Sequence, residues 1–310
     1  MKILVCFLAV VVALVVGLPQ RLEPIKLNPS KLALLPRECG VAKYGPRSDG
    51  IKSQAFEFPW IALVLFKQTR RPATCFGTLI NQRYVLSVIG CVRKTKKDPD
   101  FIRLGEQSAL TNPDCSELKQ RDGSVRKECA GPTVEIPIES YVAHPEFDLP
   151  MYTNDLALMR MSREVQYNDY IRPICLPTTP ELLNNIPRDL LMTAWELDAN
   201  VPTHYVGELE KYQIENMDLD SCQREYEKAG FTPEFEYKRF CAAQKGPNYV
   251  CSRMAGAPIG AVVDVEGTQR HVQFAMAKFA PLNCTARQTV PIISMRISEY
   301  MGWITNNLEP

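Results

Sequence analysis

The sequence predicts an all-β fold, either a sandwich or a barrel. From about residue 56 onward, short runs of β-branched and aromatic residues are separated by turn residues, which is typical of antiparallel strands. The clearest runs cover residues 60–66, 84–88, 133–142 and 269–279. Only two stretches have helical spacing, and we find no internal repeat. The core is therefore expected to consist of sheets.

Helices are expected at residues 218–228 and 297–307, where Ser298 is placed to cap the second. Residues 18–49 differ from the rest, because they carry several prolines and basic residues with little periodicity. We interpret residues 18–49 as an extended N-terminal arm tethered through Cys39. Residues 50–310 are expected to form one large domain.

Residues 1–17 have the layout of a secretory signal peptide. Lys2 precedes an apolar run from Ile3 to Val16, which is too short to span a bilayer comfortably and is the only run of its kind. With Cys6 removed, ten of the 11 cysteines remain, an even number that favours disulfides in an oxidising compartment. The protein is thus predicted to be secreted and extracellular, with no membrane span.

Charge and composition exclude several functional classes. The chain has 36 Lys+Arg against 35 Asp+Glu and is 45% hydrophobic, as in an ordinary globular protein. This balance argues against nucleic-acid binding driven by bulk charge. The cysteines show no zinc-ligand spacing, and we expect no metal and no cofactor.

The order of motifs resembles the chymotrypsin-like (trypsin-family) serine proteases, in particular the secreted insect relatives of clip-domain proteases. The resemblance covers roughly residues 39–310 and rests on six motifs, which read FPWIALV from Phe58, TLINQRYVLSVIGC ending at Cys91, NDLALMRM from Asn154, IRPICLP around Cys175, CSRMAGAPI from Cys251 and PIISMRISEYMGWI near the end. It implies a double six-stranded antiparallel β-barrel with a C-terminal α-helix.

The resemblance also implies a disulfide framework and the loss of one module. The implied bridges are Cys39–Cys175, Cys75–Cys91, Cys115–Cys129, Cys222–Cys241 and Cys251–Cys284. A clip module needs six further cysteines, and residues 18–38 contain none. The clip domain is therefore expected to be absent.

Two of the three catalytic positions implied by the resemblance lack the required chemistry. Hydrolysis in this family needs a serine nucleophile, a histidine base and a buried aspartate that orients the base. The histidine position is Gly90, which cannot take a proton, and the serine position is Ala255, which has no oxygen. Only the aspartate remains, as Asp155. We predict that the protein is a pseudo-protease and not an enzyme.

The activation and oxyanion positions are also altered. The family's acid that pairs with the newly cleaved N-terminus is here Met254, and a glycine that helps to form the oxyanion hole is here Arg253. Cleavage after Arg47 is compatible with the sequence, but no Ile-x-Gly-Gly tetrapeptide follows it. The former specificity pocket is expected to be filled, because its floor and wall positions are Tyr249, Ala280 and Ile292.

One substitution suggests a contact. Lys278 stands where relatives have a serine that supports the buried aspartate, and Gly90 leaves the imidazole space empty. Because a buried carboxylate is costly without a partner, we predict an Asp155–Lys278 ion pair. The alternative is an exposed lysine on a strand edge.

Two surface features allow two interpretations each. Asn283 begins a glycosylation sequon, so that a glycan at this residue is one interpretation. The other is an unmodified asparagine, because the central residue of the sequon is Cys284, which the implied framework places in a bridge. Glu106, Asp114 and Glu117 lie in a loop where some relatives bind calcium, although a solvated acidic loop is the simpler interpretation.

Taken with the family, the altered residues suggest a binding role. The resemblance implies a cofactor, scaffold or decoy in an extracellular proteolytic cascade, such as insect immunity or melanisation, whose partners are cascade proteases or their substrates. One alternative is a residual hydrolase with a non-standard nucleophile, although His144 belongs to a surface loop in the family and His204 and His271 are remote in sequence from every motif. Another is a secreted reproductive or gut binding protein.

Overall fold

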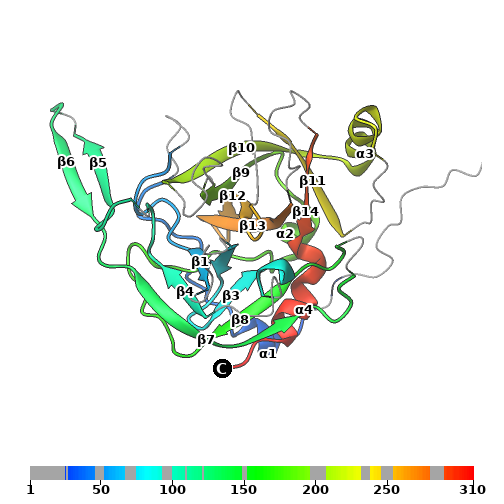
Figure 1. The fold of residues 1–310 in the computed structure, drawn as a ribbon, viewed down its shortest axis with the longest axis horizontal. Helices are drawn as coiled ribbons and strands as arrows, with labels where there is room; N and C mark the ends of the chain where they lie inside the picture. The colour runs from blue at the N-terminus through cyan, green and yellow to red at the C-terminus, as the bar shows by residue number, and fades with distance from the viewer. Residues whose placement is uncertain are drawn as a thin grey trace, which may run out of the picture.

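The computed structural model describes residues 25, 27–45, 52–66, 75–92, 100–108, 110–120, 122–148, 152–195, 207–231, 238–245, 254–279 and 290–310. In this part of the chain, two closed six-stranded barrels lie one above the other in Figure 1, with α4 (Met301–Asn306) at their side. The predicted pair of antiparallel barrels with a C-terminal helix is confirmed.

The first barrel takes its strands from the first half of the domain. The strand order is β1-β2-β3-β8-β7-β4, and every pairing is antiparallel. The strands are β1 (Ile61–Leu65), β2 (Cys75–Leu79), β3 (Tyr84–Ser87), β4 (Phe101–Leu104), β7 (Val134–Ala143) and β8 (Ala157–Met161). All residues of β2 and β3 are buried, so these two strands form much of the core.

The second barrel has the strand order β10-β11-β14-β13-β12-β9. Its strands are β9 (Asp189–Trp195), β10 (Leu209–Met217), β11 (Arg239–Gln244), β12 (Pro258–Val265), β13 (Thr268–Phe279) and β14 (Ile292–Arg296). The hairpin of β12 and β13 is long, and its turn places Glu266 and Gly267 at positive φ. Buried side chains of both barrels join one continuous hydrophobic core.

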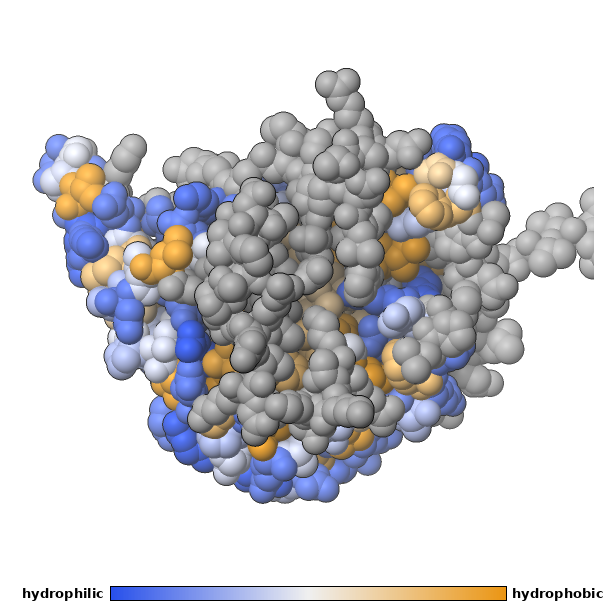
Figure 2. All heavy atoms as spheres, in the orientation of Figure 1, coloured by the Kyte–Doolittle hydropathy of each residue, from blue (hydrophilic) through white to orange (hydrophobic). Residues whose placement is uncertain are grey.

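A two-stranded sheet extends from the first barrel. It consists of β5 (Cys115–Lys119) and β6 (Val125–Cys129), and it projects away from both barrels in Figure 1. Figure 2 shows mostly hydrophilic residues on it, and Val125 is the large hydrophobic side chain that it exposes. The Cys115–Cys129 disulfide closes its base.

Short helices lie between and beside the barrels. α3 (Leu219–Lys228) confirms the first predicted helix, with Asp218 as its N-cap. The second expected helix differs at its start, because a 3₁₀ turn, η2 (Ile297–Tyr300), precedes α4 and Ser298 makes no cap. Three short elements were not predicted, and they are α1 (Pro29–Leu32), α2 (Pro180–Asn184) and the 3₁₀ turn η1 (Ile89–Cys91).

The N-terminal arm is more closely packed than a segment tethered only through Cys39. It contains α1, and several of its apolar residues (Ile25, Leu27, Leu34, Leu35 and Ala42) pack against the core. Lys31 Nζ donates to the Leu308 carbonyl at 2.7 Å, so the arm contacts the C-terminal end of the chain. Residues 27–45 therefore contact the core and the C-terminal end of the chain in addition to their tether through Cys39.

Four of the five implied disulfides are present in the described residues. These are Cys39–Cys175, Cys75–Cys91, Cys115–Cys129 and Cys222–Cys241. Cys251–Cys284 and the proposed signal peptide lie outside the described residues. None of the described helices is long and apolar enough to cross a membrane.

Candidate functional site

A tight turn at residues 254–257 carries the position where the nucleophile was expected. Its backbone is held from two sides, because Phe76 N–H donates to the Ala255 carbonyl at 3.2 Å and Gly256 N–H donates to the Ala277 carbonyl at 2.9 Å. Gly256 has φ +89°, and a Cβ there would lie 1.9 Å from the Phe76 carbonyl oxygen. Only glycine fits. The turn is therefore built by backbone contacts, and Ala255 supplies a methyl group where the chemistry needs an oxygen.

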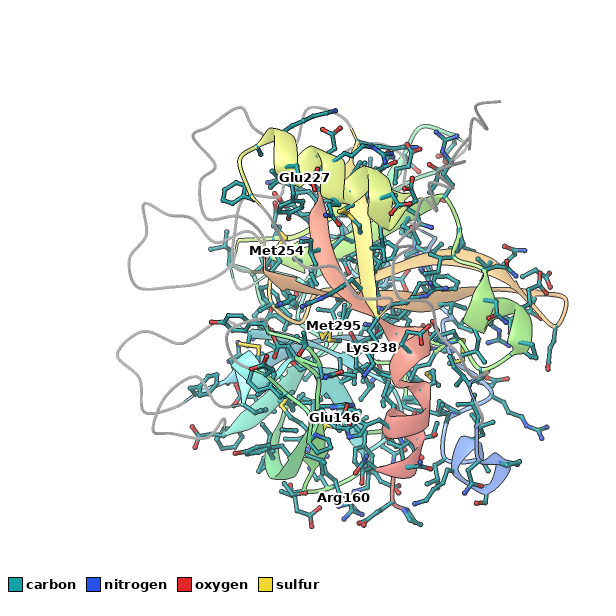
Figure 3. The ribbon with its side chains drawn as sticks, turned by 90° about the vertical axis from the view of Figure 1, so that its right-hand side faces the viewer. Glu146, Arg160, Glu227, Lys238, Met254 and Met295 are labelled. Atoms are coloured by element: carbon teal, nitrogen blue, oxygen red, sulfur yellow. A yellow bond between two sulfur atoms is a disulfide. The ribbon has the colours of Figure 1, made fainter. Side chains whose placement is uncertain are left out.

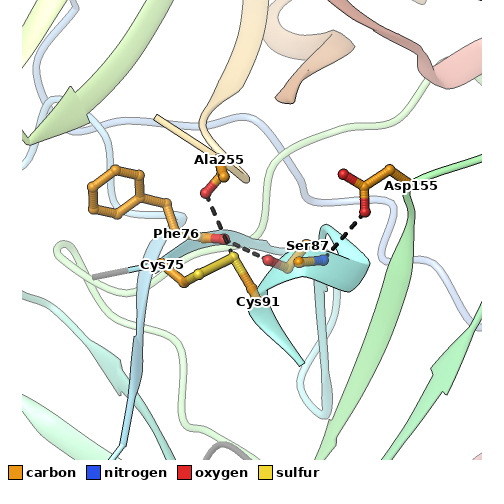
Figure 4. Close-up of a disulfide and its surroundings, with 7 residues drawn as sticks. Cys75, Phe76, Ser87, Cys91, Asp155 and Ala255 are labelled. Atoms are coloured by element: carbon orange, nitrogen blue, oxygen red, sulfur yellow. Dashed lines mark hydrogen bonds between the residues drawn. A yellow bond between two sulfur atoms is a disulfide. The ribbon is translucent and has the colours of Figure 1, made fainter. Parts of the chain in front are cut away.

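Asp155 is buried next to the position where the base was expected. It is 3% exposed, and its Oδ1 accepts a hydrogen bond from Gly90 N–H at 3.2 Å (Figure 4). Burial raises the pKa of Asp155, while the N–H groups of Gly90 and Ile89 and the positive charges of Lys278 and Arg239 oppose that rise. Apart from its chain neighbours and the backbone of its own helical turn, no described atom lies within 4 Å of the place where a Cβ of Gly90 would stand.

The segment before Asp155 is held in an unusual backbone conformation. Tyr152 and Asn154 both have positive φ, at 48° and 51°. Lys238 Nζ donates to Asn154 Oδ1 at 3.1 Å and lies 3.8 Å from Glu146 Oε2 (Figure 3), and Arg239 Nη1 donates to the Tyr152 carbonyl at 3.3 Å. Two basic residues at the start of β11 therefore fix the loop that positions Asp155.

Lys278 does not contact Asp155 in the way that we predicted. Its ammonium lies over the ring of Tyr152, 5.1 Å from the ring centroid, and Tyr152 is 43% exposed. Its charge lowers the pKa of Asp155, but no Asp155–Lys278 ion pair is among the contacts of the described residues.

The remaining predicted site residues are only partly within the described structure. Met254 and Ile292 are buried, at 3% and 1% exposure. Tyr249, Arg253, Ala280, Asn283 and Arg47 lie outside the described residues. The filled specificity pocket therefore stays a prediction.

His271 packs against the FPWIALV motif, although it is remote from that motif in sequence. It lies on β13, 6% exposed, with its ring 4.8 Å from Trp60 and 5.9 Å from Phe58 between centroids. Its Nε2 is buried without a hydrogen-bond partner among the described residues. Burial lowers the pKa of His271 to about 4, so the ring is neutral at physiological pH. His144 packs instead on Tyr300 and Trp303, and His204 lies outside the described residues.

Sequence reasoning missed a buried ion pair between the barrels. Lys211 Nζ of β10 lies 3.1 Å from Glu57 Oε2, and the two side chains are 4% and 1% exposed. Nearby, Ser53 N–H and Oγ both donate to the Leu209 carbonyl at 2.8 Å. The segment before β1 is thereby joined to the second barrel. Because the partners are 154 residues apart, no local pattern could have indicated this pair.

The acidic loop at residues 106–117 is satisfied by protein groups. Asp114 accepts hydrogen bonds from the N–H groups of Gln107 and Ser108 and from Thr111 Oγ1, at 2.6, 3.0 and 2.5 Å. Arg103 Nη1 lies 3.1 Å from Glu106 Oε2. In the described part of the chain, no group of three or more His, Cys, Asp or Glu residues has a metal-binding arrangement.

Comparisons with known proteins agree with this geometry. The family model described as Trypsin matches residues 48–304. The chain is 30% identical to Melanization protease 1 of Drosophila melanogaster, over 93% of this chain and 72% of that protein. It is 28% identical to Phenoloxidase-activating factor 3 of Holotrichia diomphalia, over 87% of this chain and 75% of that protein. The crystal structure of the Drosophila Grass clip serine protease of the Toll pathway superposes with a TM-score of 0.73 at 26% identity, over 91% of this chain and 78% of that one.

Proposed function

The chain belongs to the trypsin family, and we propose that within this family it is a secreted, non-catalytic homologue that works by binding other proteins. We propose further that it acts as a cofactor, scaffold or decoy in an extracellular proteolytic cascade. Its partners would be proteases of that cascade or their substrates.

One observation carries the proposal of inactivity. The two side chains that should meet beside Asp155 belong to Gly90 and Ala255, which offer neither a proton acceptor nor a nucleophile. Triad members act as a unit, so that losing the base and the nucleophile together removes most of the rate enhancement. The scaffold around them is retained, because the turn at residues 254–257 still has its backbone hydrogen bonds. A retained scaffold without reactive groups favours recognition over hydrolysis.

The cascade context comes from the relatives. The names of two of them refer to melanization and to phenoloxidase activation, and the similar crystal structure is that of a Toll-pathway protease. Four disulfides in the described residues and the apolar N-terminal run support secretion. We extend the relatives' context to this chain as a proposal.

Two surfaces suit partner binding. The first is the altered former active-site face, which includes the exposed ring of Tyr152 with Lys278 over it. The second is the hairpin of β5 and β6, which projects from the first barrel and exposes Val125 and Arg126 (Figure 1). A projecting, disulfide-closed hairpin presents a rigid contact surface at low entropic cost.

The test of inactivity uses the purified full-length secreted chain. A fluorophosphonate probe, which labels reactive serines, is expected to give no stoichiometric labelling, and a panel of peptide substrates no turnover. An active trypsin-family protease at the same concentration serves as the positive control. Labelling that reaches one probe per chain, or turnover that persists after contaminating proteases are removed, would contradict the proposal and favour a hydrolase with a non-standard nucleophile.

The cascade role is tested separately in cell-free insect haemolymph. Adding the chain is expected to change the rate of phenoloxidase activation after microbial challenge, and removing the tip of the β5–β6 hairpin is expected to reduce that effect. Affinity capture from the same fluid then identifies the bound proteins. A chain that captures no cascade component and changes no rate would exclude this role and leave the reproductive or gut alternative.

A further inference from the structure

The outer strand of the β5–β6 hairpin has an edge that no other strand of the described structure covers. The hairpin is a sheet of two strands only, and Figure 1 shows β6 on the side of β5 that is turned away from the barrels. Val125, Arg126 and Lys127 of β6 are all exposed. An uncovered edge strand presents a row of main-chain N–H and C=O groups, to which another strand can add.

The pairing of the two strands shows which main-chain groups face this edge. Lys127 of β6 lies opposite Glu117 of β5. In the same register Gln120 lies opposite Ser124, and its N–H donates to the Ser124 carbonyl at 2.8 Å. Hydrogen-bonded and non-hydrogen-bonded pairs alternate along an antiparallel ladder, so the odd-numbered residues direct their N–H and C=O groups away from the partner strand. At Val125 and Lys127 these groups therefore face the outer edge of β6.

The outer edge is held in an extended conformation by contacts made elsewhere in the hairpin. Ser116 Oγ of β5 donates to the Ala55 carbonyl at 2.7 Å, and the Cys115–Cys129 disulfide closes the base. In the described part of the chain, no main-chain hydrogen bond joins Val125 or Lys127 to another segment. A strand that adds to this edge therefore meets a preformed template, and little conformational entropy of the hairpin is lost.

The charges beside the edge indicate which strand fits. Arg126 and Lys127 are consecutive, so their exposed basic side chains flank the edge on its two faces. The acidic Glu128 of β6 is engaged by Lys43. A second copy of β6 paired antiparallel about Lys127 would place two Lys127 side chains directly opposite each other, which is unfavourable. A strand with a carboxylate opposite Lys127 is favoured instead.

We propose that the outer edge of β6 binds an extended, acidic segment of a partner protein as an added antiparallel strand. The main-chain groups of Val125 and Lys127 exchange hydrogen bonds with the segment, and a carboxylate of the segment lies opposite Lys127. The contact is non-covalent. That a partner in a proteolytic cascade supplies the segment rests on the proposed function, whereas binding of an acidic strand does not.

The probe is a blocked octapeptide of alternating Val and Glu, titrated into the full-length chain in a calorimeter. Saturable binding is expected. A peptide residue opposite Lys127 directs its own N–H toward β6. N-methylation of the Glu residues is therefore expected to weaken binding by about 10-fold or more, because it removes these donors. N-methylation of the Val residues, whose N–H groups face away from β6, is the matched control and is expected to leave the affinity unchanged.

Two variants at one position separate the main-chain contribution from the charge. Lys127→Pro removes the N–H that faces the edge, a change that edge strands tolerate, and is expected to abolish peptide binding. Lys127→Ala keeps the N–H and removes the charge, and is expected to weaken binding by only about 2- to 5-fold. Circular dichroism and a free-thiol assay check that both variants keep the fold and the Cys115–Cys129 bridge.

Four results would overturn the inference. They are no saturable binding of the Val–Glu peptide, equal affinities for the two N-methylated peptides, unchanged binding by a folded Lys127→Pro variant, and tighter binding of a peptide with Lys in place of Glu. A dimer in sedimentation that Lys127→Pro dissociates would identify a second copy as the occupant and would contradict the acidic partner. The haemolymph assay is run on the same samples, so that failure of the cascade role is distinguished from failure of strand addition.

Discussion

The ion pair of Glu57 and Lys211 allows a sharp prediction about stability. Both side chains are almost fully buried, at 1% and 4% exposure, and the pair joins the segment before β1 to the second barrel. We predict that Lys211→Met strongly destabilises the protein, because it removes the ammonium that lies 3.1 Å from the buried Glu57 carboxylate.

The expected magnitude follows from the burial. Breaking a buried pair by removing one partner costs about 3–5 kcal/mol. In a domain of this size each kcal/mol changes the melting temperature by about 2–4 °C, which gives a decrease of about 6–20 °C. The double variant Glu57→Leu/Lys211→Met replaces the whole pair by apolar groups and is expected to recover most of that loss.

Urea unfolding followed by tryptophan fluorescence is the assay, because irreversible heat unfolding would report a rate. The matched control is Lys228→Met, whose Lys228–Glu225 pair is exposed, at 70% and 45%, and contributes about 0.5 kcal/mol or less. A Lys211→Met variant as stable as Lys228→Met would contradict the predicted cost of breaking the buried pair. A double variant no more stable than the single one would contradict it as well.

Three further predictions concern pH, backbone strain and cleavage. Burial lowers the pKa of His271 to about 4. Between about pH 6.5 and pH 4, the His271 ring is therefore protonated in the unfolded chain but not in the folded chain. Stability to urea should therefore fall by about 3 kcal/mol on acidification through this range, and His271→Phe should reduce this fall. Gly256→Ala should cost more in urea unfolding than Gly123→Ala, because both glycines have positive φ but a Cβ meets protein only at Gly256. Trypsin cleavage after Arg47 should give two fragments that separate on a gel only after reduction, because Cys39 is bonded to Cys175; separation without reduction would contradict that bridge.

Much of the fold could be predicted from local patterns. The strand runs at residues 60–66 and 84–88 became β1 and β3, and the helical stretch at residues 218–228 became α3. These elements were predictable because periodicity and turn residues act over a few neighbouring positions. The barrel closure itself was predicted from the family resemblance and not from the residues alone.

The features that were missed depend on distant contacts. His271 of β13 is remote in sequence from Trp60, yet their ring centroids lie 4.8 Å apart. Lys278 was expected to neutralise the buried Asp155 carboxylate, but its ammonium lies 5.1 Å from the centroid of the Tyr152 ring. Neither the ring's position nor its exposure is encoded within a short window of sequence. Prediction therefore identified the altered residues at the site but not their contacts.

The hydrogen bonding of the turn at residues 254–257 bears on how a trypsin-family chain with alanine at position 255 arises during evolution. Since main-chain groups of β2 and β13 hold the turn, the side chain at Ala255 contributes little to keeping it in place. A lineage can therefore exchange a serine for an alanine there without losing the folded molecule. The exchange of alanine for serine at this position should disturb the turn just as little. Ancestral reconstruction would show how often each of the two exchanges has occurred.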